Sequence, residues 1–332
     1  MEILYRIIMI YLLFDNPGDK GKLSFISQLI HGEVNEIYSP KSKRLIFGWL
    51  KGCKNALVVS HSDDTSVCWY DFQAILCYWL CKITFKRRKI VCINLLLKDK
   101  VTVKNKIVAW LYKKALESRH FVASVTSKEY GEHIKKRLGI KKDFFLLHDV
   151  YHDSYCYNKY VEVKPNTVFC GGRNGRDWHF MVEVAKAMPD VEFHLVMPEA
   201  TYQELSNDLP INVVAKYNLS YNDFMMEMCA SEIVALPLDT EAPAGLIVLF
   251  QAAANMKPII TTDTMTTREY LSDGRGCLLP NIVDDWKKVI NEKFGNAKSN
   301  IIASEKLLDF LETECSERKF VEGVESMINK LE

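Results

Sequence analysis

The sequence predicts an α/β protein with two similar domains, each built on a parallel sheet, and with a cleft between them. Three observations predict this fold. Apolar strand-like runs alternate with helix-like segments in both halves of the 332 residues. An irregular stretch separates the halves, and the chain is long enough for two cores of ordinary domain size. An apolar content of 48% and a charged content of 26% are typical of globular proteins.

The first domain is predicted over residues 1–150. Strands are expected near residues 3–13, 56–60, 90–95 and 121–125, and helices near residues 72–82 and 106–117. Because the first apolar run contains Arg6 and is too short to span a bilayer, we interpret it as a strand and not as a signal peptide. The loop that follows contains Gly18 and Gly21, which either shape a turn or approach an acceptor.

Residues 151–166 show no clear period and are predicted to form a linker, and the second domain is predicted over residues 167–332. Its expected strands are residues 167–170, 192–196, 212–215, 232–238, 259–260 and 277–279, and its expected helices are residues 178–187, 221–229 and 246–256. Two final helices, near residues 304–311 and 320–331, are expected to pack back on the first domain.

The most informative segment is residues 231–263, which reads as strand, glycine turn, small-residue helix, proline and strand. Gly245 lets the backbone approach a ligand, and the free N–H groups at the start of the following helix suit a diphosphate. Ligands of open α/β sheets lie beyond the carboxyl ends of the strands, where this turn is expected. An ordinary βαβ unit without a ligand is the alternative interpretation.

Three segments of the second half resemble one family. The first carries Gly245, Leu246, Gln251, Ala252, Lys257 and Pro258. The second is VFCGGRNGRDW over Val168–Trp178, and the third combines Thr267–Tyr270 with Asp273–Gly276. In this order they resemble retaining glycosyltransferases of the two-Rossmann GT-B architecture, family 4, and in particular capsule and exopolysaccharide members. The resemblance implies a nucleotide-sugar donor as substrate, transfer with retention of anomeric configuration, no cofactor and no metal.

The resemblance also assigns residues to the donor. Gly171, Gly172, Arg173 and Arg176 would form the loop that binds the phosphates, with Gly245 and Leu246 adding backbone N–H groups. Gln251 would bond the ribose hydroxyls. The alternatives are an exposed surface loop for the arginines and an exposed helix face for Gln251.

The chain departs from the family at Pro243, where the first of two glutamates should stand. Glu241 or Asp239 would then reach the donor sugar from a shifted loop. His61, expected just after a strand of the first domain, is a candidate for the acceptor side, although a lone histidine at a strand end is more often structural. No metal cluster is visible, because Cys77 and Cys81 lack a second pair of ligands.

Charge is distributed unevenly along the chain. Residues 1–150 hold 26 lysines and arginines against 14 acidic residues, and the remainder holds 17 against 28. The sequence contains no nucleic-acid-binding motif. An aromatic helix over Trp69–Phe85 ends in Lys86, Arg87, Arg88 and Lys89, a pattern typical of a helix at an anionic membrane surface. A buried crossover helix with a solvated basic turn is the alternative.

These observations predict a hexosyltransferase that adds sugar to a lipid-linked or oligosaccharide acceptor during polysaccharide biosynthesis. Ten cysteines without paired spacing indicate a reducing compartment, so we expect a cytoplasmic enzyme, peripheral at the inner face of the plasma membrane. Two alternatives stay open: a nucleotide-sugar epimerase on the same fold, and a non-catalytic relative that binds a nucleotide or a glycan.

Overall fold

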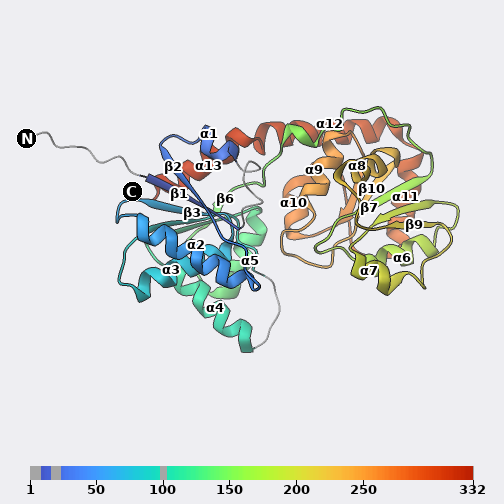
Figure 1. Cartoon of the computed structure of the whole chain (residues 1–332). Coiled ribbons are helices and arrows are strands. Elements are labelled where there is room, and N and C mark those ends of the chain that lie inside the picture. The colour runs from blue at the N-terminus through green and yellow to red at the C-terminus, as the bar shows by residue number, and fades with distance from the viewer. Residues whose placement is uncertain (1–8, 16–23, 98–102, 332) are drawn as a thin grey trace, which may run out of the picture. The chain divides into compact units, whose positions relative to one another are not determined.

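A computed structural model describes residues 9–15, 24–97 and 103–331. The chain divides into two compact units (Figure 1). Unit 1 comprises Met1–Val150 and Glu317–Glu332, and unit 2 comprises Tyr151–Ser316. The loop with Gly18 and Gly21 lies outside the described residues.

Among its described residues, unit 1 contains a six-stranded parallel sheet in the order β2-β1-β3-β4-β5-β6. The strands are β1 (Met9–Phe14), β2 (Glu33–Tyr38), β3 (Thr65–Cys68), β4 (Lys89–Cys92), β5 (Phe121–Val125) and β6 (Phe145–Leu146). The central strands are almost continuously buried, as expected for parallel strands with helices on both faces.

Helices cover both faces of this sheet. They are α1 (Ser24–Leu29), α2 (Leu45–Val59), α3 (Asp71–Ile83), α4 (Val103–Leu116), α5 (Lys128–Leu138) and α13 (Glu317–Asn329). Helices α2, α3 and α4 lie on one face, and α1 and α13 lie on the other (Figure 1). The apolar side of α13 completes the core of unit 1, where Phe320, Val324 and Met327 pack with Leu12 and Val91 of the central strands.

The strand predicted over residues 56–60 is wrong, because these residues form the last turns of α2 and the residue that caps it. Val58 and Val59 are exposed, so the apolar run is not a buried strand. Helix α2 instead lies close to the backbone beyond β2 through Gly48 and Gly52, where an added Cβ would meet Pro40 O at 2.5 Å and Ser39 Oγ at 2.7 Å. The strand that precedes α3 is β3, which the sequence did not predict.

The residues of unit 2 are all described and form a second six-stranded parallel sheet, in the order β12-β11-β10-β7-β8-β9. The strands are β7 (Thr167–Gly171), β8 (Glu192–Val196), β9 (Val213–Lys216), β10 (Ile233–Leu236), β11 (Ile259–Thr262) and β12 (Cys277–Leu279). The first strand, β7, lies in the middle, and the chain then builds the sheet outward on one side and later on the other. The order therefore reverses between β7 and β10.

Two layers of helices cover this sheet. A core that includes Trp178 and Trp286 packs α6 (Trp178–Lys186), α7 (Glu199–Leu205) and α11 (Val283–Phe294) on one face. A core that includes Phe250 and Tyr270 packs α8 (Tyr221–Ala230), α9 (Leu246–Ala254), α10 (Met265–Leu271) and α12 (Ala297–Glu314) on the other.

Residues 151–166 belong to unit 2 and begin with the 3-10 turn η2 (Asp153–Tyr155). Tyr151 N–H donates to Cys315 O at 2.7 Å, and Lys164 N–H donates to Ala230 O at 2.8 Å. Of the two final helices, α12 lies in unit 2 and α13 in unit 1.

Five cysteines are buried together in unit 1: Cys53, Cys68, Cys77, Cys81 and Cys92. A hydrogen bond with Cys77 and burial raise the pKa of Cys68 and of Cys81. Residues 68 and 92 are paired across β3 and β4. Within residues 9–15, 24–97 and 103–331, no group of three or more His, Cys, Asp or Glu side chains is arranged to hold a metal ion.

Candidate functional site

The candidate site lies in unit 2, where the strand order reverses between β7 and β10. Two loops leave the carboxyl ends of these strands and are bonded to each other. Asp177 N–H donates to Pro237 O at 3.0 Å, and Asp239 N–H donates to Gly175 O at 3.1 Å. In open α/β sheets this reversal point is where ligands bind.

Arg176 is the central side chain of this site. It is 5% exposed, and its Nε donates to Gly171 O at 2.9 Å. Its Nη1 is buried and has no hydrogen-bond partner among the described residues. Burial lowers the pKa of Arg176, and the neighbouring Cys170 partly offsets this effect. A buried guanidinium remains charged, so the missing partner of Nη1 is best supplied by an anion.

Gly172 and Gly245 make room for this guanidinium, and both have left-handed backbones, with φ of +131° and +79°. An added Cβ at Gly172 would lie 3.0 Å from Arg176 Nη2, and one at Gly245 would lie 2.6 Å from Nη1. At Gly171, an added Cβ would meet the ring of Phe169 at 2.5 Å. The predicted glycines therefore allow the close packing around Arg176.

Gly245 is also the N-cap of α9, and no side chain caps this helix. The first backbone bond back into the cap is Leu249 N–H to Gly245 O, at 3.0 Å. The N–H groups of the first turn, beginning with Leu246, and the positive end of the helix dipole thus lie beside the guanidinium of Arg176. Together they form an anion site of the kind that binds phosphate.

Arg173 is on the same loop as Arg176, but it is exposed. The structure therefore separates the two predicted arginines into a buried, fixed cation and a solvated one.

Glu241 lies on the β10–α9 loop, and its carboxylate is directed to the start of α10. Its Oε2 accepts the Met265 N–H at 2.9 Å, and its backbone oxygen accepts the Thr266 hydroxyl at 3.4 Å. This bond satisfies one free N–H of the α10 amino terminus and places a negative charge at the positive end of the helix.

Gln251 lies six residues along α9 from Gly245 and is buried, so the exposed helix face considered for it is wrong. Its side chain bonds the hydroxyl of Tyr221. Burial raises the pKa of Tyr221, and the bond from Gln251 opposes that rise.

His61 needs a correction. It follows α2 and not a strand, and it precedes β3. It therefore lies at the amino edge of the sheet in unit 1, opposite the carboxyl edge at which an α/β sheet binds ligands. The His61 side chain is exposed, and its backbone N–H donates to Asp64 Oδ2 at 2.7 Å.

The sequence missed the residues that brace the two loops. Asn281 Nδ2 donates to Asp177 Oδ2 at 3.1 Å and to Leu238 O at 3.0 Å. Thr262 Oγ1 accepts the Leu238 N–H at 2.7 Å and donates to Asn281 Oδ1 at 2.6 Å. Asn281 follows a short strand and a proline, and no sequence signal connects it with residues more than forty positions away.

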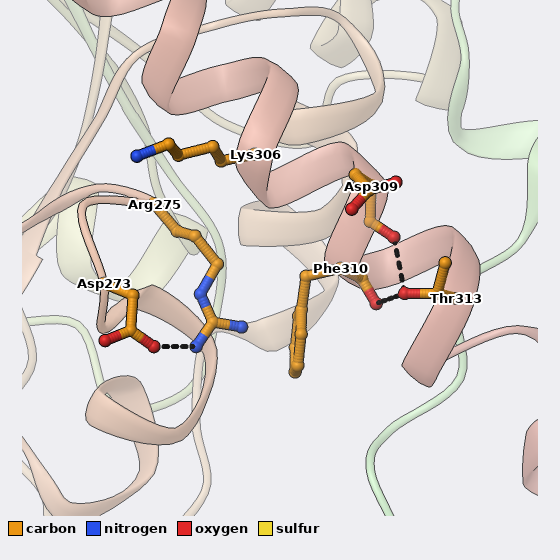
Figure 2. A pocket seen from close by; sticks show the side chains of 6 residues that line it. All are labelled: Asp273, Arg275, Lys306, Asp309, Phe310 and Thr313. Carbon is orange, nitrogen blue, oxygen red and sulfur yellow. Dashed lines mark hydrogen bonds and ion pairs between the residues drawn. The ribbon is translucent and has the colours of Figure 1, made fainter.

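The third motif lies elsewhere in unit 2. Asp273 and Arg275 belong to the turn before β12, at the amino edge of the sheet, and line an open groove of about 520 Å³ beside α12. Figure 2 shows Arg275 between Asp273 and Phe310. The guanidinium lies 3.9 Å from the centre of the Phe310 ring, and its Nε donates to Ser272 O at 2.8 Å. Arg275 therefore holds the turn against α12 and is no part of the anion site.

In unit 1, the predicted membrane helix is α3. Half of its ten apolar side chains are buried, and of the others only Phe72 and Ile83 are exposed. Of the four cations that follow it, two bond the carboxyl end of α2. Lys86 Nζ donates to Leu57 O at 2.8 Å, and Arg88 Nη2 donates to Ser60 O at 2.6 Å. The alternative of a buried crossover helix therefore fits α3 itself, and the exposed segment is the basic turn that follows α3. No helix in the part of the chain that the structure describes is long and apolar enough to cross a bilayer.

Solved glycosyltransferase structures are similar to this chain over nearly its whole length. Anabaena Alr3699/HepE in complex with UDP-glucose gives a TM-score of 0.73 at 12% identity and covers 97% of this chain and 99% of its own. The chain has the GT-B fold. WaaG, a glycosyltransferase involved in lipopolysaccharide biosynthesis, gives 0.65 at 14% identity, over 96% of this chain and 98% of its own. A mutant of S. aureus TarM, in complex with UDP and other ligands, gives 0.64 at 13% identity, over 84% and 59%.

These matches confirm the predicted GT-B fold class, with a parallel α/β sheet in each unit. No family model and no curated protein matches the sequence.

Proposed function

We propose that the protein is a glycosyltransferase that moves a sugar from a nucleotide-sugar donor to a glycan acceptor. The observation that carries the proposal is the buried Arg176, beside the uncapped amino terminus of α9, whose Nη1 has no partner in the part of the chain that the structure describes. A nucleotide diphosphate supplies the missing negative charge. The HepE structures, which contain UDP or UDP-glucose on the same fold, support this assignment.

The site suits the chemistry of a departing diphosphate. As the glycosidic bond breaks, negative charge grows on the leaving phosphate, and Arg176 together with the α9 N–H groups is already in place to stabilise it. Arg173 adds a second cation from the same loop. We propose that these groups act without a metal ion and that the reaction retains the anomeric configuration, as in family 4.

We assign the remaining donor contacts to Glu241, for the sugar, and Gln251, for the ribose. Both side chains have a structural bond as well, to α10 and to Tyr221. For Glu241, the second carboxylate oxygen would make the contact with the sugar.

The acceptor is proposed to be a lipid-linked glycan of the capsular or exopolysaccharide type, with the enzyme peripheral at the cytoplasmic face of the membrane. Helices α2, α3 and α4 support this. They hold seven lysines and one acidic residue, Asp71, which is buried. These helices form a layer on one face of unit 1 in which every charged side chain except the buried Asp71 is positive. Such a layer is complementary in charge to anionic headgroups.

The decisive experiment incubates the protein with a panel of UDP-sugars and GDP-sugars, with and without a lipid-linked acceptor. We expect one donor to release its nucleotide diphosphate in an acceptor-dependent manner, and Arg176→Met to slow the release by about a hundredfold or more. Acceptor-independent change of the donor sugar would indicate an epimerase instead. Nucleotide binding without turnover of any donor would indicate a binding protein.

A further inference from the structure

The last residue of α3 and the turn that follows it expose two large apolar side chains. Ile83 is 71% exposed and Phe85 is 96% exposed. Phe85 has a φ of +53°, the left-handed conformation that commonly follows the end of a helix, and Lys86 N–H closes the end of α3 by donating to Cys81 O at 2.9 Å.

Neighbouring bonds hold this turn against the end of α2. Lys86 bonds Leu57 O, and Arg88 Nε donates to Ser60 Oγ at 2.9 Å. Between these two acceptors lie Val58 and Val59, which are 68% and 50% exposed. Val58 and Val59 at the end of α2, and Ile83 and Phe85 at the end of α3, are thus exposed apolar side chains on two segments that these bonds join. We call these four side chains the apolar tip.

Cations surround the apolar tip. Lys82 and Arg87 flank it in sequence. His120, on the α4–β5 turn, lies beside the start of β4, because Ile90 N–H donates to His120 O at 2.9 Å, and Arg119 Nε donates to His120 Nε2 at 3.2 Å. Burial lowers the pKa of His120, and Arg119, Arg87, Lys82 and Lys142 lower it further, in that order. Lys142 lies before β6 and is itself influenced by Lys330, which follows α13. The acidic residues nearest in sequence to these groups are Asp63, Glu117 and Asp143, and Asp143, which directly follows Lys142, is paired with Lys135 at 2.6 Å.

We propose that the apolar tip inserts among anionic lipid headgroups, that the surrounding cations bind the lipid phosphates, and that protonation of His120 strengthens this attachment. The proposal deepens the membrane attachment proposed above by naming its contact site and its regulation. Exposed Phe, Ile and Val side chains surrounded by Lys and Arg match the surface of a lipid bilayer, in which anionic headgroups lie over apolar acyl chains.

The direction of the pH effect follows from the charges around His120. Four cations disfavour its protonation in the free protein. Lipid phosphates bound by these cations offset their charge, so that His120 takes up a proton more readily at the membrane. Attachment therefore strengthens as pH falls, by at most about tenfold per pH unit for one proton.

Vesicle flotation tests the tip. On vesicles of phosphatidylcholine with phosphatidylglycerol we expect the wild type to float, and the Ile83→Ser/Phe85→Ser variant to partition about tenfold less. Ile211→Ser removes an exposed apolar side chain from unit 2 and is the matched control. In addition, Phe85→Trp should shift its emission to the blue on these vesicles, and Ile211→Trp should not. Equal partitioning of the double variant and the wild type, or no shift for Phe85→Trp, would overturn the proposal.

The pH arm uses the same vesicles between pH 7.5 and pH 5.5. We expect partitioning of the wild type and of His179→Gln, an exposed histidine in unit 2, to rise several-fold on acidification. His120→Gln should remove most of that rise. An unchanged pH profile in His120→Gln would contradict the regulatory part.

Donor binding separates this proposal from the proposed function. The Ile83→Ser/Phe85→Ser variant should bind the nucleotide diphosphate as the wild type does, because the tip lies in unit 1 and the anion site in unit 2. A wild type that floats but binds no nucleotide would refute the transferase while leaving the lipid contact intact.

Discussion

Arg176 Nη1 lies 2.6 Å from the point where a Cβ at Gly245 would stand. The cation at the end of β7 and the helix that follows β10 can therefore approach each other only because residue 245 has no side chain. This contact brings a buried positive charge and a free helix amino terminus to one place in unit 2, and it makes Gly245 the position at which the site can be tested most directly.

Gly245→Ala should displace Arg176 and strain the backbone. At a φ of +79° an L residue costs about 1–2 kcal/mol, so we expect the melting temperature to fall and nucleotide binding to be lost. Gly295→Ala is the control, since its φ is −86° and an added Cβ there has its nearest neighbour at 4.0 Å. Calorimetry with UDP and GDP, next to thermal unfolding, gives both quantities. Normal binding in Gly245→Ala would show that the contact is unimportant.

Arg176→Met should separate stability from function. Replacing an unpaired buried charge by an apolar side chain of similar length removes a desolvation cost, so the free energy of unfolding should change by less than about 1 kcal/mol. Transfer should slow by about 2–4 kcal/mol of barrier. Arg318→Met, at an exposed position of α13, controls for loss of an arginine. A variant that keeps the wild-type rate with a confirmed donor would remove Arg176 from the site.

Glu241 has two proposed roles that variants can distinguish. Glu241→Ala removes the acceptor of the Met265 N–H and should cost about 1 kcal/mol of stability, whereas Glu241→Gln keeps an oxygen there and should unfold near the wild-type temperature. If the carboxylate also contacts the donor sugar, both variants should transfer more slowly with unchanged affinity for the free nucleotide diphosphate. Wild-type transfer in Glu241→Gln would leave only the capping role.

Gln251 is buried, and this changes what its variants should do. On an exposed helix face Gln251→Glu would be harmless, but a carboxylate at a buried position loses its hydration and should destabilise unit 2 by a few kcal/mol near neutral pH. Because protonation relieves the cost, the loss should shrink as pH falls. Chemical denaturation of Gln251→Glu at pH 5 and pH 8 checks this. A variant as stable as the wild type at pH 8 would mean that water reaches the side chain.

The decrease in the free energy of unfolding at acid pH should depend on Glu227. Burial raises its pKa, but bonds from Lys216 and His194 outweigh burial, so the pKa lies below the ordinary value of 4.5. A depressed pKa contributes stability that is complete above the unfolded value and is lost as pH falls through the folded one. Glu227→Gln should therefore unfold more easily at pH 7 and lose less stability on acidification. Glu162→Gln, at an exposed position, should follow the wild-type curve.

The sequence predicted those elements whose local pattern agrees with their tertiary position. Strands β5, β8 and β12 were predicted at their observed bounds. Strand β12 is a short apolar run, β5 is apolar apart from one serine, and β8 alternates polar and apolar residues from Glu192 to Leu195. The apolar run from Ala56 to Ser60 was wrongly predicted to be a strand, because β-branched residues at the exposed end of a helix give the same sequence pattern as a buried strand.

The same limit applies to the site. The glycine turn at Gly245 was predicted to let the backbone approach a ligand, and the family resemblance placed Gly172 and the two arginines on the phosphate loop. The contrast between Arg173 and Arg176 could not be predicted, because it arises from Gly171 O and from the loop after β10. The brace through Asn281 could not be predicted either, since it joins residues that only the folded sheet brings together.

Helix α13 belongs to unit 1, yet the chain reaches it only after all of unit 2. On the ribosome, the first 150 residues therefore emerge without Phe320, Val324 and Met327, which complete their core. Nascent domains usually become stable in the order of their synthesis. Here unit 2 is complete first, and one face of the sheet in unit 1 stays partly uncovered until α13 has been synthesised. During synthesis, unit 1 is therefore the part of the chain that a chaperone is expected to bind.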